Sequence, residues 1–453
     1  MQQATHRDST MEGTPVTELA DRTDQTGAAQ GRPVPQIVTE LPGPRARAHI
    51  EFDRRYTSPS LPRAYQIVPV RGEGLVVEDI DGNRFLDFAA GIAVSGTGYG
   101  HPRITEAVQR QARDLLHFSA SDFYLPIYAQ LAAELDRIAP MAGATRAFLT
   151  NSGAEAVEGA IKLARYATGR QYLVSFLGAF HGRTYGAVSL TASKAKYHAH
   201  FGPLLPGVLH VPYGSAGLDE LEERVFKRLV PADEIAAIFV EPIQGEGGYI
   251  VPDAEFLPRL RELCTRHGIL LVADEVQSGM GRTGRMWAIQ HWGVEPDVLL
   301  AAKGIASGLP LGAMVARAEL MTWGMGAHGS TFGGNPVSCA AALETIRLLE
   351  EGLIDNAAER GEQALEGLRP LVRRHERIVR DVRGVGLMIG VQLDSGMTAD
   401  AVQEECFQRG LLVLGAGEDA VRMSPPLTVT PEEMEIGVRI FSEVVAAVER
   451  RPR

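Results

Sequence analysis

The feature that most constrains this chain is a series of short apolar runs, each followed at once by polar or glycine-rich residues. Between about residues 147 and 315 the runs alternate with helical stretches, which is typical of a parallel sheet covered by helices. The runs cover residues 147–150, 172–176, 237–240, 269–273 and 298–301. They are followed, in order, by Asn151-Ser152-Gly153, Gly178-Ala179-Phe180-His181-Gly182, Glu241-Pro242, Asp274-Glu275 and Lys303-Gly304. Because ligands in open α/β sheets lie beyond the carboxyl ends of strands, we expect these five ends to meet at one site.

Length and charge narrow the class of protein. A chain of 453 residues is longer than one hydrophobic core usually supports, so we expect at least two packed units. The net charge of −11 argues against nucleic acid as a partner, because phosphate binding needs a basic face. No apolar run approaches the roughly 18 residues that a membrane span requires.

The cysteines and the N-terminus indicate the compartment. Cys264, Cys339 and Cys406 lie far apart and show no CxxC spacing, so we expect neither a disulfide framework nor a metal site. The first residues contain no apolar segment of the kind found in signal peptides. A cytoplasmic location is the default expectation.

Composition and periodicity suggest how the chain is divided. Residues 1–38 are polar and lack periodicity, which predicts a disordered tail. Residues 74–87 are expected to form a hairpin with Asp81-Gly82 at its turn, within an N-terminal segment over 39–95. A large domain is expected over 96–350. Residues 351–453 are expected to form, with the hairpin, a smaller α+β domain.

Lys303 and Asp274 are the strongest chemical candidates at the strand ends. A lysine that is partly desolvated at a sheet edge has a lowered pKa and can act as a nucleophilic amine or as an acid and base. Asp274 could keep a pyridine nitrogen protonated, although a helix N-cap is an equally good interpretation of this residue alone. Gln277 could hydrogen bond a ring oxygen or simply lie at the surface.

Two further motifs could bind an anion and a planar ring. Small residues at 151–156 precede an apparent helix, whose N-terminal N–H groups could bind phosphate, although a plain helix cap fits equally well. Phe180 could stack on a planar cofactor, and Arg183 could bind a carboxylate with two hydrogen bonds. Taken alone, the motif of Phe180 and Arg183 fits equally a structural aromatic residue beside a solvated arginine.

Six motifs in this order resemble those of the class III aminotransferases, the group that contains 4-aminobutyrate and acetylornithine/ornithine transaminases. They are SGAEA, FHGRT, EPIQGEGG, ADEVQSGMGRTG, the lysine of AKG and HGSTFGGNP. The resemblance runs from about Leu61 to the C-terminus. It implies a fold-type I enzyme dependent on pyridoxal 5′-phosphate, with a large α/β domain, its mostly parallel sheet flanked by helices, and a smaller α+β domain. It also implies a homodimer, or two dimers paired into a tetramer.

The resemblance assigns a cofactor role to eight residues. Lys303 would hold the cofactor as a Schiff base and then move a proton, and Asp274 would pair with the pyridinium nitrogen. Gln277 would contact the ring hydroxyl. The others would bind the phosphate or the ring: Gly153 and Ala154 through backbone N–H groups, Phe180 by stacking, His181 beside it, and Thr331 from the neighbouring subunit.

The resemblance also assigns the substrates, an amine donor and 2-oxoglutarate. Arg183 would bind the distal carboxylate, with Glu241 nearby. Glu246 would neutralise Arg422 while the ω-amine is bound and swing away when Arg422 holds an α-carboxylate. Ile92 lies where 4-aminobutyrate enzymes have an apolar residue, so the sequence favours 4-aminobutyrate, giving a semialdehyde and glutamate.

Other interpretations stay open at this point. Acetylornithine and ornithine enzymes share FHGRT and the paired arginine, and amino-acid racemases of the same family share these motifs as well. A non-enzymatic relative would be favoured by loss of Lys303 or Asp274, and both are present. A glutamate-semialdehyde aminomutase must retain its intermediate, whereas the pair of Glu246 and Arg422 favours exchange with a second substrate.

Overall fold

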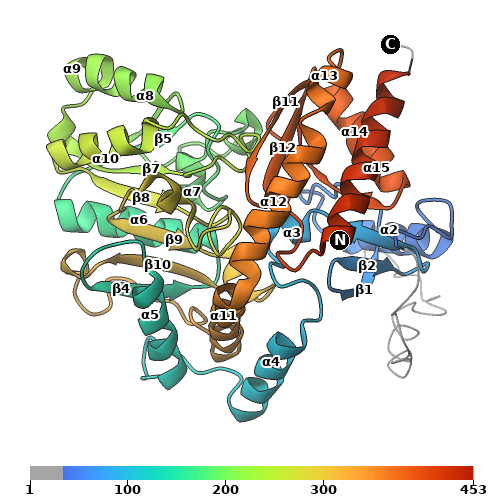
Figure 1. Cartoon of the computed structure of the whole chain (residues 1–453). Coiled ribbons are helices and arrows are strands. Elements are labelled where there is room, and N and C mark those ends of the chain that lie inside the picture. Colours follow the sequence, from blue (N-terminus) through green and yellow to red (C-terminus); the bar gives the residue numbers. More distant parts are fainter. Residues whose placement is uncertain (1–33, 452–453) are drawn as a thin grey trace, which may run out of the picture.

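Three sheets organise the part of the chain that the computed structural model describes, residues 34–451 (Figure 1). The largest has seven strands in the order β4 (Thr145–Thr150), β10 (Gly312–Arg317), β9 (Val298–Ala301), β8 (Leu270–Asp274), β7 (Ile235–Val240), β5 (Tyr172–Phe176) and β6 (Val208–Val211). Strands β6, β5, β7, β8 and β9 run parallel, and β10 is antiparallel to both of its neighbours. The predicted α/β fold with a mostly parallel sheet is confirmed.

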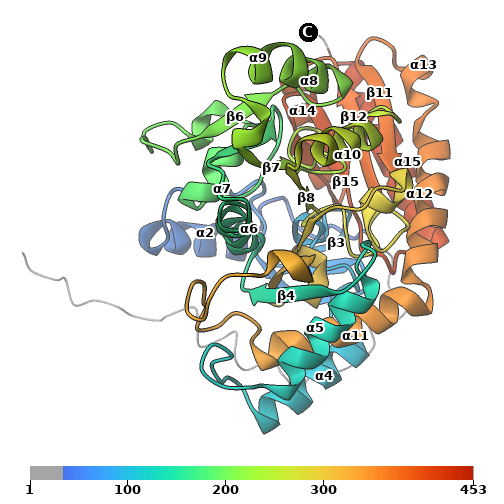
Figure 2. The same cartoon turned by 90° about the vertical axis from the view of Figure 1, so that its left-hand side faces the viewer.

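The sheet is apolar on both faces, which explains why its strands appear in the sequence as continuous apolar runs. Leu271 and Leu299 belong to one core layer, together with α5 (Pro126–Ile138), α10 (Phe256–His267) and α11 (Pro336–Leu348). Val272 and Leu300 belong to the opposite layer, with α6 (Gly153–Thr168) and α7 (Tyr185–Leu190). Figure 2 shows the helices on either side of the sheet.

The five predicted runs all fall on strands of this sheet, and two strands were missed. Strand β6 lies at an edge and is only partly buried, so its run is short and contains His210. Strand β10 follows Lys303 closely and runs in the opposite direction, which the alternation of strands and helices does not predict.

The other two sheets connect the N-terminal and C-terminal parts of the chain. One contains β1 (Pro69–Glu73), β2 (Val76–Asp79), β3 (Arg84–Asp87) and β13 (Leu411–Leu412), in that order. The predicted hairpin is β2–β3, and β13 pairs with β3 in parallel. The third sheet has the order β11 (Val379–Val385), β12 (Met388–Leu393), β15 (Ala420–Met423) and β14 (Leu414–Ala416). In Figure 1 the N-terminal hairpin lies beside α15 (Pro431–Glu449), at the opposite end of the sequence.

The domain limits stay a prediction, and two of them can be placed on the structure. The limit at residue 350 lies within a π-helical turn, Leu349–Leu353, between α11 and α12 (Ile354–Leu368). Residues 1–33 of the predicted tail lie outside the described residues. Residues 34–38, which were predicted to belong to the tail, are ordered. Gln36 exchanges backbone hydrogen bonds with Arg84, and the N–H of Val38 donates a hydrogen bond to Oδ1 of Asn83. Within residues 34–451, no helix is long and apolar enough to cross a bilayer.

A left-handed turn follows β3. The four residues of α3 (Ala90–Ala93) have φ values of 46°, 62°, 69° and 57°. Left-handed helical backbone costs roughly 1–2 kcal/mol for each L-residue other than glycine, and only Gly91 is exempt. The β-branched Ile92 is the least expected residue in such a turn.

Candidate active site

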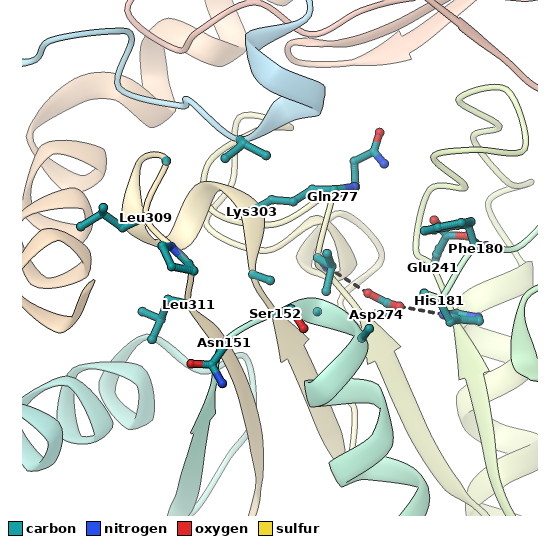
Figure 3. Close-up of a pocket in the computed structure, with 18 residues that line it drawn as sticks. Asn151, Ser152, Phe180, His181, Glu241, Asp274, Gln277, Lys303, Leu309 and Leu311 are labelled. Atoms are coloured by element: carbon teal, nitrogen blue, oxygen red, sulfur yellow. Dashed lines mark hydrogen bonds and ion pairs between the residues drawn. The ribbon is translucent and has the colours of Figure 1, made fainter. Parts of the chain in front are cut away.

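Five strand ends of the large sheet open onto one cavity of about 410 Å³. Its lining includes residues that follow β4, β5, β7, β8 and β9. Eight of the predicted site residues line it: Gly153, Ala154, Phe180, His181, Glu241, Asp274, Gln277 and Lys303. Figure 3 shows Lys303 and Leu309 on one side of the cavity and Phe180, His181 and Glu241 on the other, with Asp274 between them.

Lys303 is held by the turn that ends β9. It has a φ of 46° and begins a short 3-10 turn, Lys303–Ala306, so its side chain leaves the strand direction and enters the cavity. Burial lowers the pKa of Lys303 from 10.5 to about 8, opposed by the negative charge of Glu246 and assisted by the positive charge of Arg422. A much larger fraction of this amine than of an ordinary lysine is therefore neutral and nucleophilic near neutral pH.

Asp274, the last residue of β8, is buried and paired with His181. Its Oδ2 lies 2.7 Å from Nδ1 of His181, and its Oδ1 accepts a hydrogen bond of 3.1 Å from the N–H of Val276. Burial would lower the pKa of His181, but the hydrogen bond and charge of Asp274 raise it above the ordinary value. Within the described residues, Nε2 of His181 has no hydrogen-bond partner.

The N-terminus of α6 forms another wall of the cavity. Ser152 caps the helix by accepting a hydrogen bond of 3.2 Å from the N–H of Glu155, which leaves the first N–H groups unpaired within the helix. A side chain at Gly153 would come within 2.9 Å of Val276. The missing side chain thus allows the backbone of α6 to lie against the segment that carries Asp274 and Gln277.

Glu241 and Arg183 do not contact each other. The carboxylate of Glu241 accepts hydrogen bonds of 3.0 Å from the N–H groups of Phe180 and Gly245. Burial, followed by the charge of Asp274, raises the pKa of Glu241 to about 7, against the opposing effect of His181. Arg183 is exposed outside the cavity lining, with its guanidinium 5.0 Å from the ring centre of Tyr197.

Arg422 and Glu246 form an ion pair next to the cavity. Arg422 lies on β15 and is buried, and its Nη1 also lies 3.4 Å from Oε1 of Gln277. Burial would lower the pKa of Arg422 and raise that of Glu246, but the charge of each partner outweighs burial and keeps both groups ionised. Among the described residues, Nε of Arg422 has no partner.

Ile92 and Thr331 lie outside the cavity lining and are exposed on the single chain. Several lining residues were not predicted from the sequence, namely Val94, Val276 and the segment Gly308-Leu309-Pro310-Leu311. The last of these follows Lys303 closely, and that position was its only signal. No cluster of three or more His, Cys, Asp or Glu side chains suited to a metal ion occurs in residues 34–451.

Comparison with known proteins gives the family. The profile described as "Aminotransferase class-III" matches residues 58–445. This chain belongs to the class III aminotransferases. Class III aminotransferases depend on pyridoxal phosphate, and the residues of this cavity fit that cofactor. The aminotransferase has a lysine with a lowered pKa, a buried carboxylate and a helix N-terminus around one space of suitable size.

The relatives of this aminotransferase carry different names. The acetylornithine aminotransferase of Gloeobacter violaceus is 43% identical over 389 residues, 84% of this chain and 94% of the relative. The 4-aminobutyrate aminotransferase of Mycobacterium tuberculosis is 38% identical over 441 residues, 91% and 98% of the two chains. The crystal structure of ornithine aminotransferase from Toxoplasma gondii superposes with a TM-score of 0.83 at 33% identity, covering 89% of this chain and 96% of that one.

Proposed function

We propose that this aminotransferase moves the ω-amino group of an N-acetylornithine-like donor to 2-oxoglutarate, giving an aldehyde and glutamate. The observation that carries the proposal is the buried pair of Arg422 and Glu246 beside Lys303. Relatives named acetylornithine aminotransferases support this donor above 4-aminobutyrate. The order of donors inferred from the sequence is therefore reversed.

The bound pyridoxal phosphate supplies an electron sink for the carbon that carries the amino group. In this proposal Asp274 faces the ring nitrogen, Gln277 the ring hydroxyl, and the N–H groups of Gly153 and Ala154 the phosphate. Phe180 and His181 enclose the ring from the β5 side. Lys303 holds the cofactor and carries the proton at the reacting carbon, for which a pKa near 8 is well matched to neutral pH.

Arg422 and Glu246 allow one cavity to accept two substrates. While an ω-amine is bound, the pair stays closed and Arg422 offers no charge to the substrate. When 2-oxoglutarate or glutamate is bound, Glu246 moves away and Arg422 binds the α-carboxylate. Removing one partner of a buried ion pair costs about 3–5 kcal/mol, so Arg422 stays paired in both half-reactions.

Arg183 and Glu241 are assigned to the outer end of the substrate. The guanidinium of Arg183 is exposed beside Phe180, at 5.7 Å from its ring centre, where it can bind a carboxylate that extends from the cavity. Glu241 holds the N–H of Phe180 and so fixes the segment that carries Arg183. Replacing Arg183 by alanine should weaken such donors by about 1.5–3 kcal/mol, the contribution of a charged hydrogen bond.

A second copy of the chain completes the site in this proposal. The segments 115–124 and 325–332 meet, with the ring centres of His117 and Phe332 4.8 Å apart. Their exposed apolar residues form the apolar patch, namely Leu115, Leu116, Phe118, Phe123, Tyr124, Met325 and Phe332. Ser121 Oγ donates a hydrogen bond of 3.0 Å to the carbonyl of Ser330, the neighbour of Thr331. An exposed apolar patch of this kind marks a protein interface. It would bring Thr331 to the phosphate of the partner's cofactor.

4-Aminobutyrate is the second candidate donor, because Ile92 presents an apolar, 45% exposed side chain on the turn beside the cavity. A cytoplasmic location would suit the enzyme, whose three cysteines are free and buried.

The test is glutamate formation from 2-oxoglutarate with N-acetylornithine, 4-aminobutyrate and ornithine in turn. The proposal expects the highest kcat/KM with N-acetylornithine. Loss of optical activity from an α-amino acid, without any glutamate formed from these donors, would point to a racemase instead.

A further inference from the structure

The left-handed turn α3 lies against the Lys303 segment. Val94, the residue after the turn, lines the cavity together with Lys303. A methyl group added at Gly304 would lie 3.9 Å from the carbonyl oxygen of Ala93. The turn is therefore a wall of the space in which the amine donor must approach Lys303.

Asp87 and Tyr99 hold this turn in its unfavourable conformation. Oδ1 of Asp87 accepts hydrogen bonds from the N–H groups of Ala89, at 2.7 Å, and Ala90, at 3.1 Å. Oδ2 of Asp87 accepts a hydrogen bond of 2.5 Å from the hydroxyl of Tyr99. Asp87 is buried, and a strained turn persists only where its surroundings fix it this firmly.

The turn is also tied to the strand that carries Arg422. Ser424, two residues beyond Arg422, donates its backbone N–H to the carbonyl of Phe88 at 2.7 Å. Its hydroxyl donates to the carbonyl of Ala89 at 3.3 Å. The turn thus lies between the segments of Lys303 and Arg422 and is bonded to the second of them.

We propose that Asp87 and Tyr99 are positioning residues that set donor selectivity by keeping this wall rigid. This inference rests on the proposed function. It specifies the donors as amines whose amino group is attached to a CH2 group that carries no methyl branch. A wall held in this way disfavours a methyl branch on that carbon, because Val94 lines the cavity with Lys303 and the turn before Val94 is fixed by the hydrogen bonds of Asp87. Neither residue belongs to the lining of the cavity.

The first test compares Tyr99→Phe with the parent holoenzyme, using 4-aminobutyrate and its branched analogue 4-aminopentanoate. The ratio of kcat/KM between the two donors should fall about tenfold, the usual effect of one methyl group in a rigid pocket. The value of kcat with 4-aminobutyrate and the visible absorbance of the bound cofactor should stay nearly unchanged. Tyr128→Phe is the matched control, since the Tyr128 hydroxyl accepts a hydrogen bond of 2.9 Å from the N–H of Leu149 on β4, and this variant should keep the parental ratio.

A second measurement does not depend on turnover. Pentanoate and 4-methylpentanoate carry no amino group, so their dissociation constants can be read from the perturbed absorbance of the bound cofactor. Tyr99→Phe and Asp87→Asn should both reduce the preference for the unbranched acid. Equal losses for both acids, or no change, would overturn the inference even if the enzyme uses other donors. If both variants reduce the preference for pentanoate but the parent enzyme transaminates no ω-amine, only the proposed function would be overturned.

Discussion

Nδ1 of His181 lies 2.7 Å from Oδ2 of Asp274, and both side chains are buried in the lining of one cavity. Burial alone would lower the pKa of His181, but the hydrogen bond and the charge of Asp274 raise it above its ordinary value. The pair thereby connects the segment after β5 to the end of β8 and supplies the carboxylate that a protonated pyridine nitrogen requires.

Asp274→Asn should lower kcat about 100- to 1,000-fold, the usual loss when a preorganised electrostatic group is removed from an active site. His181→Gln should lose less, since an amide can still donate a hydrogen bond to Asp274. Both variants are assayed by glutamate formation, with cofactor content measured from absorbance. Asp219→Asn, at an exposed ion pair with Arg259, is the control. If Asp274→Asn kept the parental kcat at full cofactor content, Asp274 would have no role in catalysis.

Covalent capture of pyridoxal phosphate by the cofactor-free chain should depend on pH through Lys303. The neutral amine is the reactive form, and its fraction increases as pH rises through the pKa of Lys303, about 8. The capture rate should therefore rise up to about pH 8 and level off above it, when followed by stopped-flow absorbance between about pH 6 and 11. A rate that still rises steeply beyond pH 10 would indicate an ordinary lysine.

Two variants check the cause of this pH dependence. Glu246→Gln removes a negative charge that raises the pKa of Lys303, so the midpoint should move to lower pH. Arg422→Gln removes a positive charge that lowers the pKa of Lys303, so the midpoint should move to higher pH. Glu241 and Asp274 also face Lys303 and are left unchanged in both variants. Lys303→Ala should capture no cofactor covalently.

The sequence predicted the cavity better than it predicted the surroundings of the cavity. Asp274 and Lys303 end buried parallel strands, and this rule of α/β sheets brought them together without further information. Arg183 and Thr331 lie on the outer surface of the chain. The rule about strand ends predicts residues inside the cavity and does not place residues on that surface. The pairing of β3 with β13 joins residues more than three hundred positions apart, which the pattern of local runs does not predict.

The turn at Ala90–Ala93 could not be predicted at all. Its residues favour right-handed or extended backbone, and the conformation results from hydrogen bonds to Asp87 and Ser424. Only Gly91 gave a local signal, and a single glycine does not specify four consecutive positive φ values.

Glu246→Gln should favour substrates that carry a carboxylate on the reacting carbon, such as glutamate, over ω-amines. The variant leaves Arg422 buried and charged without the carboxylate of Glu246. A substrate carboxylate can take that place, so kcat/KM for such substrates should rise about tenfold or more relative to kcat/KM for ω-amines. The measurement is kcat/KM for glutamate and for N-acetylornithine in the same preparation. Glu223→Gln, at an exposed ion pair with Lys227, is the control. An unchanged ratio would show that Glu246 does not control Arg422.

Phe332→Asp should weaken self-association. The ring is 60% exposed on the single chain and belongs to the apolar patch beside Thr331, so a charge there would be buried at an interface. Sedimentation should shift toward the monomer, with loss of activity at low protein concentration. Met397→Asp changes an apolar residue that is 83% exposed on α14 (Gly396–Gln408), outside the patch, and should leave the mass unchanged. An intact dimer in Phe332→Asp would contradict the assigned interface.

The most direct test of the proposed function is the isolated first half-reaction. Holoenzyme is mixed with an excess of N-acetylornithine, without a keto acid, and the cofactor spectrum is followed in one turnover. The account predicts rapid and complete conversion to the amino form of the cofactor, slower conversion with 4-aminobutyrate, and return of the original spectrum when 2-oxoglutarate is added. A spectrum unchanged by every ω-amine, or an amino form that 2-oxoglutarate does not reverse, would contradict it.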